Sequence, residues 1–237
     1  MRYSENFATD MEDNQQIWEN IYHIGKQQIK YPYGDLPSHV FTHYGKDTDK
    51  SGLKVIEIGS GGGGNLWFFA REGFKTYGIE FSPSAVKNSQ ALLEKDGLSG
   101  DIRVGDFRAL PYEDEFFDLV LDRNSLYCVV KKDLLKAASE VRRVLKKGGR
   151  FLSYMYSAES ECLKYGEPEK IEENTYTNFK TRPFVGAGIT HFTTERELLD
   201  EIYQGFDVEY IRKTTNDFVY PKRYNDIVIF ITSGVKK

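Results

Sequence analysis

A glycine-rich turn near residue 60 carries the residue types best suited to hold a ligand against the backbone. The turn covers residues 59–64, follows the apolar run 53–58, and is preceded two positions earlier by Glu57. Glycines adopt positive φ and lack a Cβ, so backbone N–H groups can approach a bound molecule closely. The G-x-G-x-x-G spacing also matches the dinucleotide-binding fingerprint. A carboxylate beside the turn, however, attracts a cationic ligand and repels a pyrophosphate.

Two further acids follow the next two expected strands. Glu80 ends the strand expected at 75–80, where a carboxylate can accept hydrogen bonds from a pair of ribose hydroxyls. Asp106 follows the strand expected at 101–104 and can accept from an adenine amino group, while Phe107 packs on the ring. Each acid taken singly could equally cap the helix after it. Together with the glycine turn they predict a nucleoside site, because open α/β sheets bind ligands at the carboxyl ends of their strands.

The elements that must position these residues alternate between strand and helix. Short apolar runs alternate with stretches of helical periodicity, which predicts an α/β fold: a doubly wound, mostly parallel seven-stranded sheet with helices on both faces. Thr194 and Glu197 fit a capping box that opens a late helix. The segment between the last two strands is too short for a helical crossover, so the last strand is expected to be antiparallel. The expected strands cover residues 53–58, 75–80, 101–104, 116–122, 150–156, 207–213 and 226–232.

Two segments fall outside this alternation. Residues 1–50 are polar and aromatic, and the apolar spacing within 17–24 predicts a helix. This segment is therefore expected to form an N-terminal helical lid on a main domain at 51–237. Within that domain, residues 157–193 carry few regular signals. They are expected to form a substrate-side insertion, because connections of this length are usually functional or disordered.

The composition argues against several classes of partner. The 237 residues have a formal net charge of −4 and no basic stretch with interleaved aromatics, so no nucleic acid is expected. Cys128 and Cys162 lack the spacing of a metal site, and no metal is expected. No signal peptide or bilayer-length apolar run is visible, so the protein is expected in the cytoplasm without a membrane partner. It is expected to be a monomer or a homodimer.

The segments described above resemble the class I, seven-stranded S-adenosylmethionine-dependent methyltransferases. The resemblance covers roughly residues 50–156 with clear motifs, and the terminal hairpin extends it to the end of the chain. It implies that the cofactor is S-adenosyl-L-methionine, which carries a sulfonium and an ammonium, and that the product is S-adenosyl-L-homocysteine. The segments that carry the resemblance are 55–63 (VIEIGSGGG), 77–82 (YGIEFS), 105–107 (GDF), 117–120 (FDLV) and 145–150 (LKKGGR).

The resemblance also implies which residues surround each part of the cofactor. It places Glu57 and the glycine turn beside the methionine part, Glu80 on the ribose hydroxyls, and Asp106 with Phe107 around the adenine. Two residues just past the fourth strand border the methyl group. The full set expected to bind the cofactor, ending with those two, is Glu57, Gly59, Ser60, Gly61, Gly62, Gly63, Asn65, Glu80, Phe81, Ser82, Asp106, Phe107, Asp122 and Arg123.

Catalysis and acceptor binding fall to residues outside the glycine turn. Methyl transfer is an in-line displacement, for which the enzyme mainly supplies orientation and desolvation. A hydroxyl acceptor also benefits from a general base, for which the candidates are His191, Asp122 and Tyr127. We expect His191 because it ends the insertion, with a structural histidine as the alternative. The residues expected to line the acceptor pocket, unless they only pack the added segments, are Trp18, Tyr22, Tyr31, Tyr33, Tyr156 and Arg182.

The acceptor is expected to be a small molecule or a soluble biosynthetic intermediate. The stretch 121–125 (LDRNS) lacks the [Asp/Asn]-Pro-Pro-[Tyr/Phe] signature of adenine-amine and glutamine methyltransferases. The segments 18–22 (WENIY) and 30–32 (KYP) look similar to methyltransferases of bacterial surface-polysaccharide pathways, so O-methylation, with a sugar-linked hydroxyl as one candidate, is the expected reaction. The alternatives are a nicotinamide-dependent oxidoreductase, which leaves Glu57 without a role, and a non-catalytic S-adenosylmethionine-binding module.

Overall fold

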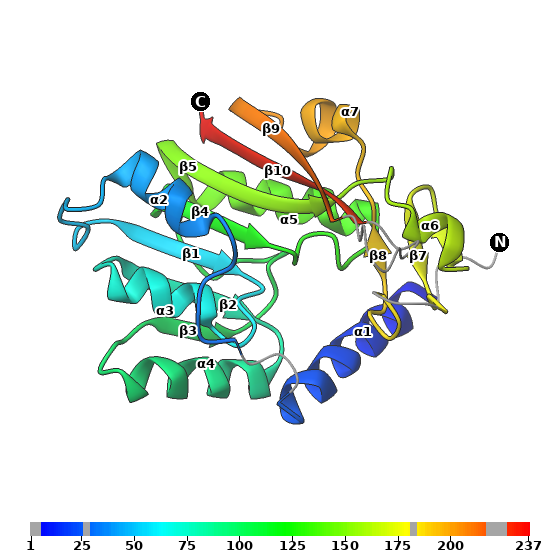
Figure 1. Ribbon diagram of the computed structural model, residues 1–237, viewed down its shortest axis with the longest axis horizontal. Coiled ribbons are helices and arrows are strands. Elements are labelled where there is room, and N and C mark those ends of the chain that lie inside the picture. Colours follow the sequence, from blue (N-terminus) through cyan, green and yellow to red (C-terminus); the bar gives the residue numbers. More distant parts are fainter. Residues whose placement is uncertain (1–5, 26–28, 181–183, 217–226) are drawn as a thin grey trace.

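A seven-stranded sheet forms the centre of the protein (Figure 1). The computed structural model describes residues 6–25, 29–180, 184–216 and 227–237. The strand order is β3-β2-β1-β4-β5-β10-β9; neighbouring strands from β3 to β5 are parallel, and β10 is antiparallel to β5 and β9. The predicted mostly parallel sheet with an antiparallel last strand is therefore confirmed. The strands are β1 (Lys54–Ile58), β2 (Lys75–Glu80), β3 (Asp101–Val104), β4 (Phe117–Arg123), β5 (Leu145–Tyr156), β9 (Phe206–Asn216) and β10 (Ile227–Lys236).

Helices cover both faces of this sheet. Successive residues of a strand point to opposite faces, so Val55 and Ile56 of β1 enter different clusters of buried side chains. The cluster around Val55 includes residues of α2, α3 and α4, and the cluster around Ile56 includes residues of α5. Strands buried on both faces read as short continuous apolar runs, which is why the sequence locates them. The helices are α2 (Leu36–Tyr44), α3 (Gly64–Arg71), α4 (Pro83–Lys95) and α5 (Lys131–Val144).

Two features near the sheet differ from the sequence prediction. The sequence does not predict α2, yet its Leu36 and Val40 are fully buried in the core. The second half of the expected lid segment therefore packs against the sheet. β5 begins at Leu145, earlier than predicted, because Leu145 pairs with Phe117 of β4 before the register shifts at a bulge.

The insertion at residues 157–193 has secondary structure of its own. It contains α6 (Cys162–Tyr165) and a three-stranded antiparallel sheet of β6 (Glu169–Glu172), β7 (Thr175–Thr177) and β8 (Thr190–His191). Cys162, Phe179, Phe184 and Phe192 form a small buried cluster within it. Strands of two to four residues are too short to show a period, so the sequence reads this segment as irregular.

A capped helical turn follows the insertion. The Thr194 side chain accepts a hydrogen bond from the backbone N of Glu197 at 3.1 Å, which confirms the predicted N-cap. The helix itself is short: α7 (Glu195–Glu197) continues as the π-helix η1 (Leu198–Ile202). Across the described ranges, no helix has the length and apolar character needed to cross a membrane.

The N-terminal helix α1 (Asn6–His23) lies beyond the carboxyl ends of the parallel strands, on the same side as the insertion (Figure 1). Asn14, which is 3% exposed, joins three segments there: its Nδ2 donates to the carbonyl of Cys128 at 2.8 Å, and its Oδ1 accepts from the N of Ile189 at 3.1 Å. Glu19 accepts from the hydroxyls of Ser82 and Ser84 at the start of α4. These contacts fix α1 across the sheet edge.

Replacing Asn14 by alanine is expected to loosen this arrangement. Asn14→Ala leaves a buried carbonyl and a buried N–H without partners, and each unmet group costs roughly 1–3 kcal/mol. We expect the free energy of unfolding, measured by urea denaturation, to fall by about 2 kcal/mol. The matched control is Gln16→Ala, an exposed position on the same helix. Equal stability of the two variants would contradict the bridging role of Asn14.

Candidate active site

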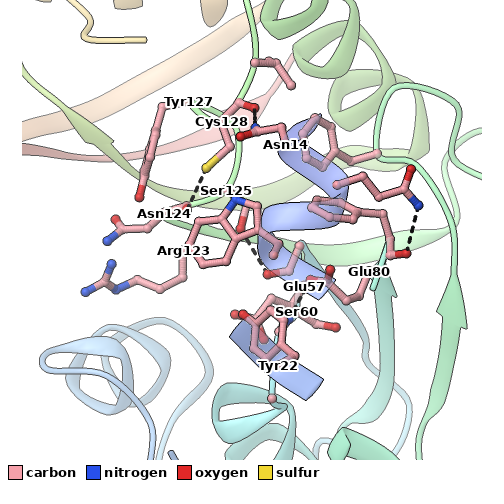
Figure 2. A pocket seen from close by; sticks show the side chains of 18 of the residues that line it. Asn14, Tyr22, Glu57, Ser60, Glu80, Arg123, Asn124, Ser125, Tyr127 and Cys128 are labelled. Carbon is pink, nitrogen blue, oxygen red and sulfur yellow. Dashed lines mark hydrogen bonds between the residues drawn. The ribbon is translucent and has the colours of Figure 1, made fainter. Parts of the chain in front are cut away.

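A cavity of about 920 Å³ opens at the carboxyl ends of the parallel strands. Its walls come from the glycine turn after β1, from the residues that follow β2, β3 and β4, and from α1 and the insertion. Figure 2 shows Arg123, Asn124 and Tyr127 on one side of this cavity and Glu80 on the opposite side, with Glu57 between them. This is the sheet edge at which the sequence predicts a ligand site.

The glycine turn brings backbone close to the cavity. Gly61 and Gly63 have φ of 51° and 83°, the left-handed region that side chains other than glycine rarely adopt. A Cβ on Gly61 would also collide with the hydroxyl of Tyr22, which reaches over the turn from α1. The backbone N of Gly61 donates to Glu80 at 3.0 Å, so the turn is tied to the end of β2. Glycine is therefore required here for both conformation and space.

Glu57 lies at the end of β1 with an incomplete set of hydrogen bonds. Its side chain is 2% exposed, and Oε1 accepts from Nδ2 of Asn65 at 2.7 Å, whereas Oε2 has no partner among the described residues. Burial raises the pKa of Glu57 to about 8, although the Asn65 amide and the nearby Arg123 guanidinium act in the opposite direction. A cation or a hydrogen-bond donor placed at Oε2 would lower the pKa of Glu57 again and favour its ionised form.

Glu80 lies at the end of β2 and is bound more completely than Glu57. Its Oε2 accepts from the N of Gly61 and its Oε1 from the N of Ser82, both at 3.0 Å. Burial raises the pKa of Glu80 while these backbone donors lower it. Each carboxylate oxygen has two lone pairs, so each can accept one more hydrogen bond from the cavity. Two hydroxyls on neighbouring atoms suit this arrangement.

Asp106 and Phe107 line the cavity as expected, but Asp106 has a partner that sequence reasoning missed. The guanidinium of Arg108 donates to Asp106 through Nε at 2.8 Å and Nη2 at 2.6 Å. A third donor of Arg108, Nη1, reaches Asp133 of α5 at 2.5 Å. The lining cation Arg108 is thus neutralised by two carboxylates. An adenine amino group would have to share the Asp106 carboxylate with Arg108.

Unmet hydrogen-bonding groups gather around this cavity. Ten buried side-chain nitrogen and oxygen atoms in the described part of the chain have no hydrogen-bond partner, and five belong to residues that line the cavity. Buried polar groups almost always have partners, so such a concentration marks a place where a ligand supplies them. The five atoms are Trp18 Nε1, Glu57 Oε2, Ser60 Oγ, Arg123 Nε and Asn124 Oδ1.

Most of the residues expected to bind cofactor line the cavity. The exceptions are Ser82 and Asp122, which are not among the lining residues. Ser82 caps α4, where its hydroxyl accepts from the N of Ala85 at 3.0 Å. The lining residues from the expected set are Glu57, Gly59, Ser60, Gly61, Gly62, Gly63, Asn65, Glu80, Phe81, Asp106, Phe107 and Arg123.

The three candidate bases lie in different surroundings. His191 is 1% exposed and outside the cavity lining, with Nδ1 2.7 Å from Thr175 Oγ1 and Nε2 3.0 Å from Glu197 Oε1. Asp122 accepts from the N atoms of Ser125 and Leu126 and from the Ser153 hydroxyl. Both ring nitrogens of His191 and both carboxylate oxygens of Asp122 therefore already have hydrogen-bond partners within the protein.

Tyr127, the third candidate, does line the cavity. Its ring centroid is 4.4 Å from that of Tyr156, and burial raises the pKa of both phenols. Both phenols therefore keep their protons at neutral pH, and the Tyr156 hydroxyl accepts from Nδ2 of Asn124.

The expected acceptor residues are divided by the structure. Trp18, Tyr22, Tyr33 and Tyr156 line the cavity. Tyr31 does not; it is 66% exposed and packs edge-on against Trp67. Arg182 lies outside the described residues. Lining residues that the site prediction omits include Asn14, Arg108, Asn124, Cys128 and Asp133.

Comparison with known proteins agrees with this geometry. Residues 56–153 match the model of the methyltransferase domain family. A probable phthiotriol/phenolphthiotriol dimycocerosates methyltransferase 2 of Mycobacterium ulcerans is 30% identical over 162 residues, covering 68% of this chain and 55% of that protein. Norajmaline N-methyltransferase of Rauvolfia serpentina is 33% identical over 141 residues, covering 56% of this chain and 48% of that protein. This chain spans about half the length of these curated relatives.

Solved structures share the fold as well. The 1,6-didemethyltoxoflavin-N1-methyltransferase of Burkholderia thailandensis, solved with its substrate and S-adenosylhomocysteine, has a TM-score of 0.67 at 15% identity. The match covers 100% of this chain and 92% of that one. Four observations indicate the same family: the glycine turn, the acids at successive strand ends, the antiparallel last strand and the matched domain. The matched part of this chain is therefore a class I, Rossmann-like S-adenosylmethionine-dependent methyltransferase domain.

Proposed function

We propose that this protein transfers the methyl group of S-adenosylmethionine to a small molecule bound in the same cavity. The observation that carries the proposal is the unpartnered, buried Oε2 of Glu57 beside the glycine turn. The cavity of about 920 Å³ is near the upper end of the roughly 300–1,000 Å³ typical of small-molecule sites. It is therefore large enough for a nucleoside cofactor together with a modest acceptor.

The described residues fit this cofactor. Glu57 offers one free carboxylate oxygen to a cationic amino acid group, and Glu80 offers two further acceptor positions to hydroxyls. Gly61 has no Cβ, which lets the Tyr22 side chain of α1 close over the turn. When bound, S-adenosylmethionine supplies a methyl group on a sulfonium and leaves as a neutral thioether. The chain's own contribution is to bind and orient the two reactants and to exclude water under α1.

The described part of the cavity wall offers no clear general base to remove a proton from the acceptor. No histidine is among the described lining residues, Asp106 and Asp133 are paired with Arg108, and Tyr127 keeps its proton. This arrangement supports an acceptor that is already a good nucleophile. Our first proposal is O-methylation of a readily ionised hydroxyl. A sugar-linked hydroxyl fits this proposal only if its own pKa is low. N-methylation of an amine is the second. The cytoplasmic location and the monomeric or homodimeric state remain predictions.

Two binding experiments and one activity assay test this proposal against its alternatives. Isothermal titration calorimetry should show S-adenosylhomocysteine binding and no binding of NADH. Binding of NADH alone would instead indicate a nicotinamide-dependent oxidoreductase. Methyl-donor consumption over a panel of small amines, phenols and sugar phosphates should then show turnover. Tight binding of S-adenosylhomocysteine with no turnover on any acceptor would favour a non-catalytic module.

The raised pKa of Glu57 predicts that cofactor binding releases a proton. With a pKa of about 8 in the free protein, Glu57 is mostly protonated at pH 7, and a cation at Oε2 lowers that pKa. We expect release of close to one proton at pH 7, measured by calorimetry in buffers of different ionisation enthalpy. Affinity for S-adenosylmethionine should rise from pH 6 to pH 7.5.

Glu57→Gln is the matched control for this pH dependence, because the cofactor has an ionisable amine of its own. The variant should bind at least about tenfold more weakly and lose the part of the proton release that Glu57 supplies. Identical proton release by the variant and the wild type would contradict the role given to Glu57.

His191 is expected to contribute to stability and not to cofactor binding. Its ring joins Thr175 of β7 to Glu197 after the insertion, so His191→Ala leaves two buried polar side chains without that partner. We expect the free energy of unfolding to fall by about 2 kcal/mol, with affinity for S-adenosylhomocysteine unchanged within threefold. If His191 is instead the base, turnover will fall at least about 100-fold while stability is kept.

A further inference from the structure

Arg123 is a cation in the cavity wall without a carboxylate partner. It lies at the end of β4, lines the cavity, and forms no ion pair with any residue in the described ranges. Its Nε is buried and has no hydrogen-bond partner. The other lining arginine, Arg108, is bound by two carboxylates. A half-buried arginine without an anionic partner can receive one.

Aromatic contacts hold the guanidinium in place. Its centre is 4.4 Å from the ring centroid of Tyr33 and 4.8 Å from that of Tyr154 on the neighbouring strand β5. The Tyr154 hydroxyl donates to Asp35 at 2.7 Å, and Asp35 also pairs with Arg212. The nearby carboxylate of Asp35 is therefore already engaged elsewhere. Ring contacts position a guanidinium and leave its in-plane N–H donors free for a bidentate anion.

The neighbours of Arg123 complete a polar end of the cavity. Asn124 has φ of 62°, an uncommon conformation for a residue other than glycine, and its Oδ1 is buried without a partner. Its Nδ2 donates to the hydroxyl of Tyr156 at 3.3 Å. Figure 2 shows Arg123 and Asn124 on the side of the cavity opposite Glu80. The Arg123 guanidinium thus lies opposite Glu80, the carboxylate suited to the ribose, although it is near enough to Glu57 to lower the pKa of that side chain.

We propose that Arg123 is the anchor for an anionic group, a carboxylate or a phosphate, on the methyl acceptor. This inference rests on the proposed function and specifies its substrate class as acidic small molecules. The Tyr156 hydroxyl, which accepts from Asn124 Nδ2, can donate to the same group, whereas the free Oδ1 of Asn124 can only accept and would bind a donor elsewhere on the acceptor. The alternative is that Arg123 binds the carboxylate in the amino acid part of the cofactor. The experiment below distinguishes an anion on the acceptor from the carboxylate of the cofactor.

The first arm measures cofactor binding in Arg123→Gln by calorimetry. The account predicts affinity for S-adenosylhomocysteine within threefold of wild type, which also shows that the variant folds. A loss of at least 30-fold for S-adenosylhomocysteine, with no loss for 5′-methylthioadenosine, which lacks the amino acid part, would assign Arg123 to the cofactor and overturn the proposal. The control is Arg196→Gln at a position that is 90% exposed in its side chain.

The second arm titrates matched pairs of probes into the complex with S-adenosylhomocysteine: benzoate against benzamide, and glucose 1-phosphate against methyl glucoside. The wild type should bind at least one anionic member tenfold or more tightly than its neutral partner. Arg123→Gln should abolish that preference and Arg123→Lys should keep part of it, because lysine retains the charge but not the bidentate geometry.

The outcomes of the second arm separate the two proposals. Equal binding or no binding of both members of each pair by the wild type would contradict the inference. So would a preference that survives in Arg123→Gln. These results leave the methyltransferase proposal standing, whereas failure of wild type to bind S-adenosylhomocysteine would overturn both.

Discussion

A carboxylate removed from water must gain hydrogen bonds, a counter-charge or a proton, and Glu57 has only one donor, the amide of Asn65. Much of the site follows from this constraint. Asn65, in the first turn of α3, also accepts from the backbone N of Tyr33 at 3.1 Å, which ties the segment before α2 to the site. Glu57 is fixed by a strand that is buried on both faces, so it cannot relieve its own desolvation by moving into solvent.

The charges of the cavity are distributed in a way that fits two ligands of opposite character. Glu57 and Glu80 provide acceptors on the side of the glycine turn, where a cationic nucleoside cofactor fits. Arg108 is neutralised by its two carboxylates, which leaves Arg123 as the unpaired lining cation in the described part of the chain. A cofactor that carries positive charge and an acceptor that carries negative charge would then attract each other at the point of transfer.

The sheet and the acids at its edge could be predicted from the sequence because both depend on local pattern. Apolar runs locate β1 and β2, and a carboxylate at a strand end must lie at the ligand-binding edge whatever the rest of the fold does. The partners of a side chain depend on distant segments and could not be predicted. His191 ends the insertion as expected, yet Thr175 and Glu197 occupy its ring nitrogens.

Other features escaped prediction for related physical reasons. Asp106 follows β3 as expected, but its ion pair with Arg108 depends on the turn between them. The separation of two residues in the sequence was a signal that could have been used. The strands of the insertion are too short to show a period. The role of Asn14 depends on contacts more than 100 positions away in the chain.

A crystal structure of the protein with S-adenosylhomocysteine bound tests the central claim most directly. The account predicts the ligand's amino group within about 3 Å of Glu57 Oε2. It also predicts the ribose hydroxyls on Glu80 and an empty guanidinium edge at Arg123. The account would be contradicted by a ligand bound elsewhere, or by one bound in this cavity with its amino group away from Glu57.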